Sequence, residues 1–213
     1  MLEEQSIVHV RGTPASGKTS LAMLLRAHLT SRHNVVFIPE WTPGDFPGDI
    51  LVNGCQRFGY DVSEMDLLNS QDGEFVFIID ESQLTYTDSR LWYTVIKSRL
   101  GSSYGPWFCL FASYGSPSNG SPDYPTAVTP PILSLGQRVS LVLSTKQGSP
   151  GICLFFGRDE FEDVVTRYCK KDDVQFTLAK DFQRYIFALT NGHPGMIRSL
   201  LMYIKTVRVH TRL

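Results

Sequence analysis

Short apolar runs alternate along most of the chain with segments whose apolar residues recur at helical spacing. The runs are rich in β-branched and aromatic side chains and end at turn-forming or polar residues, a pattern typical of strands that are buried on both faces. They cover residues 7–10, 34–41 with a stop at Pro39, 74–80, 106–113 and 137–144, and residues 151–156 form a further extended apolar segment. The pattern therefore predicts a sheet built from buried strands.

Helical periodicity fills the gaps between several of these runs. It is clear in residues 21–29 and 88–100, whereas 49–69 carries only a weak signal for a helix. Residues 114–136 are rich in Ser, Gly and Pro and predict a long loop. Because strands alternate with helices, we expect an α/β fold with a parallel, doubly wound sheet.

The pattern changes near residue 150. Three helices are expected in residues 158–170, 179–190 and 194–207, with no strand between them. This change predicts an α/β domain over residues 1–150 and a small helical lid over residues 151–213.

Composition describes an ordinary globular protein and excludes few partners. The chain has 213 residues, of which 42% are hydrophobic and 19% charged, and its net charge is -1. Nothing in this balance favours nucleic acid or an anionic membrane, so a nucleic-acid partner stays open without support from charge. No apolar run is long enough to span a membrane, and no signal peptide precedes the first strand. The abrupt start and end of the pattern suggest a domain cut from a longer polypeptide.

The four cysteines show no spacing typical of a disulfide framework or a zinc site. Because neither pairing is indicated, we expect reduced thiols in a cytoplasmic or nuclear environment. These residues are Cys55, Cys109, Cys153 and Cys169.

The strongest chemical signal is the stretch GTPASGKT, which follows the first strand and opens the first helix. It fits G-x-x-x-x-G-K-[ST], in which glycines let backbone amides curl around phosphate oxygens at a helix N-terminus. Lys18 would reach the β- and γ-phosphates, and the Thr19 hydroxyl would ligate Mg²⁺. The stretch therefore predicts a phosphate cradle for ATP or another nucleoside triphosphate. The residues expected to contact the nucleotide are Gly12, Pro14, Ala15, Ser16, Gly17, Lys18, Thr19 and Ser20.

An acidic pair follows the third predicted strand, in FVFIIDES. Asp80 fits the aspartate that holds Mg²⁺ in nucleotide-hydrolysing enzymes with this cradle. Glu81 comes next, where its carboxylate can act as general base on a water aligned with the γ-phosphate. The alternative is that Glu81 only favours the turn that follows.

A cradle combined with Asp-Glu resembles the branch of P-loop ATPases that insert an extra strand between the cradle strand and the acidic strand. In that branch the inserted strand ends in a polar sensor, which the resemblance assigns to Ser113. Gln83 is a candidate for orienting the water or contacting the γ-phosphate. An ordinary strand-end serine is the alternative for Ser113.

With these motifs and the helical tail, the chain resembles the AAA+ and STAND group of P-loop NTPases over nearly its whole length. The resemblance implies that the tail is a nucleotide lid. It also implies that a loop bearing Gly192, His193 and Pro194 lies over the base and ribose. A helix-capping role is the alternative for His193.

More narrowly, VRGTPASGKTSLA, FIIDESQLTY, LFFGRDEFEDVV and LTNGHPGMI look like the NTPase module of Crinkler effectors of oomycetes and fungi. That resemblance implies a regulatory NTPase module, covalently linked to header and effector domains. It also implies action in a host nucleus after secretion of the full-length protein.

Two departures from the AAA+ pattern concern arginines. Gly195 and Met196 stand where the lid helix usually begins with a sensor arginine, and Arg198 follows one turn later. Residues 114–137 contain no basic residue that could serve as an arginine finger, so Arg138 and Arg158 are the nearest substitutes. The departures argue against hexameric motor action and leave a homo-oligomer open.

Two other functions remain. One is a nucleoside or small-molecule kinase. Glu40 and Trp41, after the second strand, faintly resemble the acid and tryptophan that deoxynucleoside kinases use at that place. The arginines that such kinases carry on a lid between later strands are replaced here by Ser, Gly and Pro. A nucleic-acid-stimulated ATPase lacks a basic stripe. A GTPase switch is disfavoured because Asn-Lys-x-Asp is absent and residues 144–147 imitate it poorly.

Overall fold

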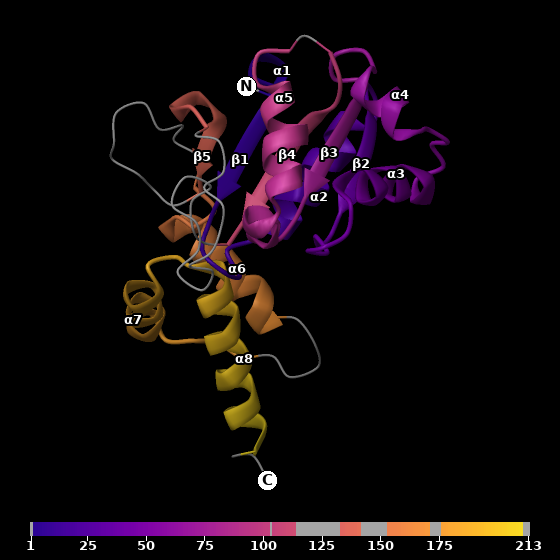
Figure 1. The fold of residues 1–213 in the computed structure, drawn as a ribbon. Helices are drawn as coiled ribbons and strands as arrows, with labels where there is room; N and C mark the ends of the chain where they lie inside the picture. Colours follow the sequence, from indigo (N-terminus) through magenta and orange to yellow (C-terminus); the bar gives the residue numbers. More distant parts are fainter. Residues whose placement is uncertain (1, 103, 114–132, 142–152, 171–175, 211–213) are drawn as a thin grey trace.

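Five parallel strands form one sheet in the order β2-β3-β4-β1-β5 (Figure 1). The computed structural model describes residues 2–102, 104–113, 133–141, 153–170 and 176–210. The strands are β1 (Ile7–Arg11), β2 (Asn34–Ile38), β3 (Phe75–Ile79), β4 (Trp107–Ala112) and β5 (Arg138–Ser140). The predicted parallel sheet is confirmed, and β4 is inserted between β1 and β3.

Helical segments cover both faces of the sheet, as the doubly wound prediction requires. The helix α2 (Lys18–Leu29) packs on one face with Val8 and Val10 of β1. The opposite face carries α3 (Pro47–Arg57), α4 (Glu64–Leu68), the 3-10 helix η1 (Ser82–Thr87), the π-helical turn η2 (Leu91–Ile96) and α5 (Lys97–Arg99). Two short elements, α1 (Leu2–Gln5) and the 3-10 helix η3 (Leu135–Gln137), flank β1 and β5.

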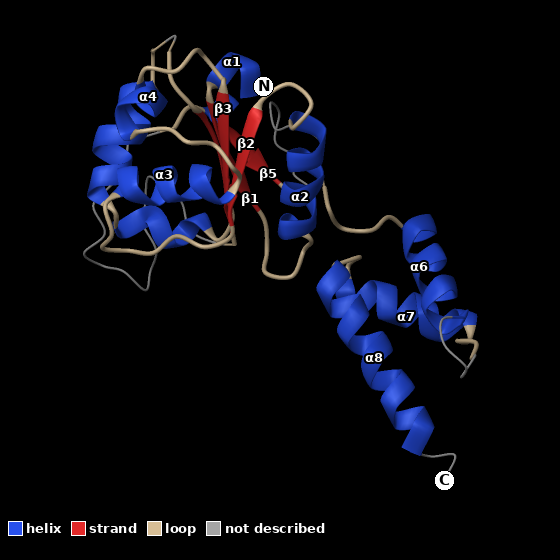
Figure 2. Cartoon of the chain, turned by 90° about the vertical axis from the view of Figure 1, so that its right-hand side faces the viewer, coloured by secondary structure: helices blue, strands red, loops and turns tan. Residues whose placement is uncertain are grey.

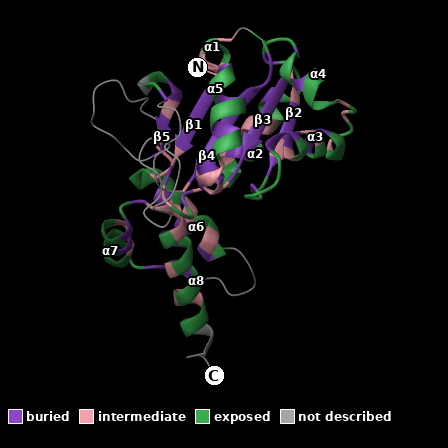
Figure 3. Cartoon of the chain, in the orientation of Figure 1, coloured by how far each residue is buried: buried purple, intermediate pink, exposed green. Residues whose placement is uncertain are grey.

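The strands are buried because their side chains feed both layers of the core. In β3, Val76 and Ile78 pack toward α2, whereas Phe77 and Ile79 pack toward the other face. All five residues of β3 are buried, and this strand is coloured purple in Figure 3. Each such side chain stabilises the fold by about 1.5–3 kcal/mol relative to its exposed state.

Two segments differ from the expected pattern in detail. The weak signal in 49–69 corresponds to two helices, because Gly59 takes a left-handed conformation with φ 83° and ends the first. A capping box between Ser63 and Asp66 then starts α4. The helix predicted in 88–100 is a π-helical turn that continues as α5.

The three C-terminal helices form a separate layer with its own core (Figure 2). They are α6 (Arg158–Lys170), α7 (Lys180–Thr190) and α8 (Pro194–His210), close to the predicted bounds. Phe161, Ile186, Ile197 and Leu201 lie at the centre of this core. The predicted lid is therefore a compact helical unit, while the boundary expected near residue 150 lies outside the described residues.

The four cysteines are free thiols, and three of them are buried. Burial raises the pKa of Cys55 to about 11 and that of Cys109 to about 12, so both thiols stay protonated. Within the described part of the chain, none of the helices has the length and apolarity needed to cross a bilayer.

Candidate active site

The loop between β1 and α2 forms the predicted cradle at the carboxyl edge of the sheet. The Gly12 amide donates to Ala112 O at 3.2 Å, which ties the start of the loop to β4. Gly17 has φ 102° and directly precedes α2, a conformation that favours glycine. A Cβ on Gly12, the first glycine of the motif, would lie only 3.0 Å from Ser16 Oγ, so glycine is needed there for close packing.

Lys18 lies largely buried inside this loop. Its Nζ donates to Thr13 O at 2.8 Å. Burial lowers the pKa of Lys18, and the nearby charges of Glu81 and Asp80 partly oppose that shift. The ammonium is therefore held inside the loop, poorly hydrated and close to two carboxylates, where a phosphate would be a favourable partner.

The predicted metal ligands meet at the end of β3. Thr19 Oγ1 donates to Asp80 Oδ2 at 2.6 Å, and Asp80 is buried. Two oxygens from a hydroxyl and a carboxylate fit Mg²⁺, which usually completes its shell with waters and phosphate oxygens. No group of three or more His, Cys, Asp or Glu side chains suited to a metal occurs among the described residues.

Glu81 is held by a network that joins two strand ends. Its backbone is left-handed, with φ 46° and ψ 38°, and its amide donates to Asp80 Oδ1 at 3.0 Å. Glu81 Oε2 accepts a short hydrogen bond from Gln83 Nε2 and a second one from Ser113 Oγ at 3.3 Å. The Ser113 amide donates to Gln83 Oε1 at 3.0 Å, which closes the ring of contacts. The network leaves Glu81 Oε1 without a hydrogen bond to any described residue.

The lid contacts the cradle directly through the start of α8. The Met196 amide donates to His193 Nδ1 at 3.2 Å, so the neutral ring carries its proton on Nε2. That Nε2 lies 3.0 Å from Thr13 Oγ1 and donates to it. A Cβ on Gly195 would lie 2.5 Å from Ala15 Cβ, so the helix approaches the cradle as closely as a glycine allows. His193 thus both caps α8 and joins the lid to the cradle.

A cavity of about 550 Å³ lies between the cradle and α8. Lys18, Thr19 and Glu81 line it from the core, and Pro194, Arg198 and Met202 line it from the lid. Its size and its polar groups suit a nucleotide.

The three candidate arginines lie in different places. Arg198 lines this cavity. Arg158 packs over the Phe187 ring at 5.3 Å inside the lid, and Arg138 lies on β5, opposite His9 of β1. Only Arg198 of the three therefore lies at the site.

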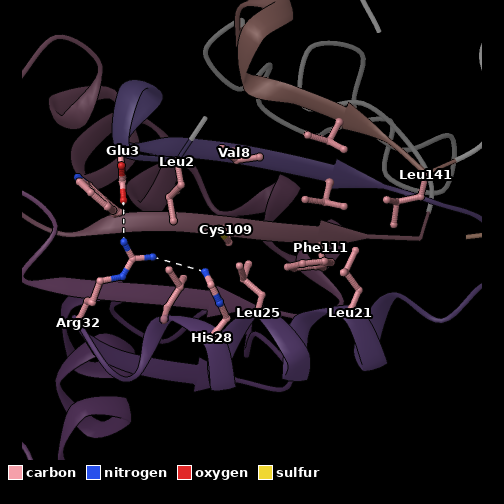
Figure 4. A pocket seen from close by; sticks show the side chains of 14 residues that line it. Leu2, Glu3, Val8, Leu21, Leu25, His28, Arg32, Cys109, Phe111 and Leu141 are labelled. Carbon is pink, nitrogen blue, oxygen red and sulfur yellow. Dashed lines mark hydrogen bonds and ion pairs between the residues drawn. The ribbon is translucent and has the colours of Figure 1, made fainter. Parts of the chain in front are cut away.

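A second cavity, of about 470 Å³, lies between α2 and the sheet (Figure 4). Leu21, Leu25 and Phe111 line it, and its charged end is formed by Arg32, which lies 3.7 Å from Glu3 Oε1. Neither the cradle nor the acidic pair lines it, so it is separate from the candidate site.

Most of the residues at this site were named as candidates from the sequence, but the contacts of two residues were missed. Thr13 occupies a variable position of the motif, and its role depends on a histidine 180 residues away. Gly195 was noted only as a missing arginine, although a glycine in the first turn of a helix signals a close approach.

The strand order and the two motifs define the class of fold. The cradle follows β1, the acidic pair follows β3, and β4 lies between them. This is the P-loop NTPase fold of the extra-strand type, with a helical lid at its C-terminal end.

The solved structures to which the chain is similar include two variants of RuvB from Thermotoga maritima. One has 17% identity and a TM-score of 0.48, the other 18% and 0.49. Each comparison covers 97% of this chain and 56% of the other, so the chain spans about half the length of those proteins. No protein-family profile and no curated protein matches the chain.

Proposed function

We propose that the chain binds and hydrolyses a nucleoside triphosphate, ATP foremost, with Mg²⁺. The observation that carries this proposal is the meeting of Lys18, the Thr19–Asp80 pair and Glu81 at one cavity beneath the lid. These are the groups that phosphate binding, metal binding and water activation each require.

The residues divide the chemistry among them. Lys18 would exchange its bond to Thr13 O for the β- and γ-phosphates, and the cradle amides would surround them. Thr19 and Asp80 would hold Mg²⁺, which when bound neutralises charge on the phosphates. Gln83 and Ser113 fix one oxygen of Glu81, so that the other can take the proton of the attacking water.

Arg198 would supply the positive charge that the AAA+ and STAND resemblance expects from the lid. Its place in the cavity supports this role, while Arg158 packs on Phe187 instead. Replacing Arg198 by alanine should slow phosphate release about tenfold, the value of one lost charged hydrogen bond. Arg158→Ala is the matched control, and an equal effect of both substitutions would contradict the assignment.

The kinase alternative loses support at Trp41. That side chain is buried in the core and donates from Nε1 to Asp88 Oδ2 at 2.9 Å, so it is not free to stack on a base. Phosphate release without any acceptor substrate would separate hydrolysis from group transfer.

At the level of the whole protein, we propose a regulatory NTPase module like that of Crinkler effectors. The support is the four sequence stretches that resemble that module, which include the cradle, the acidic pair and the lid loop. Linked header and effector domains, and a host nucleus as the place of action, are parts of the same proposal. Nuclear accumulation of the full-length protein in host cells would test them.

The direct test of nucleotide use is calorimetry with Mg-ATP and Mg-GTP, followed by phosphate release with and without DNA. Lys18→Ala should weaken binding at least about tenfold because a charged contact is lost. Lys97→Ala, an exposed lysine on α5, is the control. Equal binding by both variants would contradict the proposed cradle, and stimulation by DNA would favour a nucleic-acid-stimulated ATPase.

A further inference from the structure

Three titratable side chains gather on the sheet face opposite α2, outside the candidate active site. In the register of β1 and β5, His9 pairs with Arg138 and Arg11 pairs with Ser140. Paired residues of neighbouring strands share a face, and alternate residues of one strand do too. Val10 packs toward α2, so His9, Arg11 and Arg138 project from the other face.

Among the described residues, no acid forms an ion pair with Arg11 or Arg138. The Nε atoms of both arginines are buried and make no hydrogen bond to a described residue. The buried Arg99, by contrast, has partners: its Nε donates to Pro106 O at 3.0 Å, and its Nη2 forms an ion pair with Asp72 at 2.8 Å. An unpaired, half-buried cation is costly, and two together are costlier.

His9 lies buried on the same face as the two arginines. It is fully buried, its Nε2 lies 2.8 Å from Tyr86 Oη, and its Nδ1 is buried without a partner. The pKa of His9 is lowered to about 3, mainly by burial and further by the charges of Arg11 and Arg138. Both guanidiniums therefore lie close enough to His9 to act on its ring.

We propose that Arg11 and Arg138 form a second anion site, which binds a phosphate-type oxyanion on the sheet face opposite α2. Guanidinium groups present planar pairs of N–H donors that match phosphate oxygens, and a dianion would remove the repulsion between the two cations. Both side chains are only partly buried, so their outer atoms remain reachable from solvent. Neither arginine lines the cavity beneath the lid, so the second site does not depend on the proposed hydrolysis.

The ligand can come from two sources that share this chemistry: free phosphate, or a phosphate of a nucleic-acid backbone. The net charge of -1 and the lack of a basic stripe favour a small phosphate compound. Inorganic phosphate and a short single-stranded DNA are therefore the two probes.

The test uses the full chain with Lys18→Ala, so that the contribution of the cradle to phosphate binding is reduced. Thermal unfolding is followed while phosphate replaces chloride at constant ionic strength. We expect a saturable rise in Tm, and we expect Arg138→Gln to raise the phosphate concentration for half of that rise at least about tenfold. Arg184→Gln, an exposed arginine of the lid, is the matched control and should leave the rise unchanged.

Without phosphate, Arg138→Gln should leave Tm unchanged or raise it, because an unpaired charge is removed. A lower Tm in chloride would mean that the arginine is paired within the protein, which overturns the proposal. An undiminished phosphate response in Arg138→Gln would also overturn it. Arg11→Gln repeats the test from the other strand if Arg138→Gln does not fold. If the DNA competes with phosphate for binding, and the arginine variants lose this competition, the result would support the site and assign it to a nucleic-acid phosphate.

Discussion

Glu81 illustrates how single residues are positioned at the candidate site. A left-handed backbone costs a non-glycine residue about 1–2 kcal/mol, and the hydrogen bond from the Glu81 amide to Asp80 Oδ1 offsets part of that cost. The conformation turns the chain sharply after β3 and brings the carboxylate within reach of Gln83 and Ser113. The side chain is thus fixed before any substrate binds.

If Gln83 positions this carboxylate, Gln83→Ala should lower kcat about 10- to 100-fold and leave KM nearly unchanged, because a hydrogen bond to a charged group is lost. Steady-state phosphate release would measure both constants. Ser113→Ala should also lower kcat. The rise in activation free energy of the double variant should be smaller than the sum of the two single rises, since both donors hold the same oxygen of Glu81. A rise in KM alone would contradict the positioning role.

His9 predicts a pH dependence of stability. Its pKa is lowered to about 3 in the folded protein from the ordinary value of 6.5, so the unfolded chain binds more protons between these values. Stability is therefore fully present above pH 6.5 and falls as the pH drops toward 3. When the pH falls from 7 to 5, His9 should lower the free energy of unfolding of the wild type by about 2 kcal/mol.

Urea unfolding of wild type and His9→Gln in phosphate-free buffer would measure that loss. Other groups titrate in both proteins, so the difference between their pH slopes isolates His9. Arg11, Arg138 and Tyr86, the groups that face it, are present in both. Equal slopes would show that His9 is not held neutral.

Among the elements, those whose burial is visible in their own sequence were predictable. The strands β3 and β4 are buried on both faces, so their sequences are unbroken apolar runs. The parallel order with an inserted β4 followed from the resemblance carried by the cradle and the acidic pair. The split of 49–69 into two helices was missed, because Gly59 and the capping box act locally within a weak pattern.

The resemblance implied that the loop before α8 lies over the nucleotide, but the close approach of Gly195 to Ala15 was not predicted, because only the fold brings these two residues together. This close approach yields a prediction for Gly195→Ala. The new methyl group would meet Ala15 Cβ at 2.5 Å, so α8 must move away from the cradle. Overpacking of this kind costs about 1–3 kcal/mol, which should weaken nucleotide binding about tenfold.

Calorimetry with Mg-ATP would measure this effect. Gly157→Ala is the control in the same lid, because its methyl group meets only Glu160 Oε2 at 3.5 Å. Wild-type affinity in Gly195→Ala would show that the lid does not need this close approach.

At the scale of the whole molecule, a five-stranded sheet carries the candidate site and a helical unit lies against it. The lid has its own core and reaches the cradle through Thr13, His193 and Gly195. Movement of this unit would open and close the cavity, which suits a module that couples nucleotide state to attached domains.

The measurement that tests the central claim most directly is binding and turnover of Mg-ATP, side by side, in wild type and Glu81→Gln. Glu40→Gln is the control, since Glu40 is exposed after β2 and would matter only to a kinase. We predict that Glu81→Gln binds Mg-ATP like wild type and releases phosphate about 10²–10⁴-fold more slowly, while Glu40→Gln matches wild type in both. Normal turnover by Glu81→Gln, or no binding of Mg-ATP by wild type, would contradict the account.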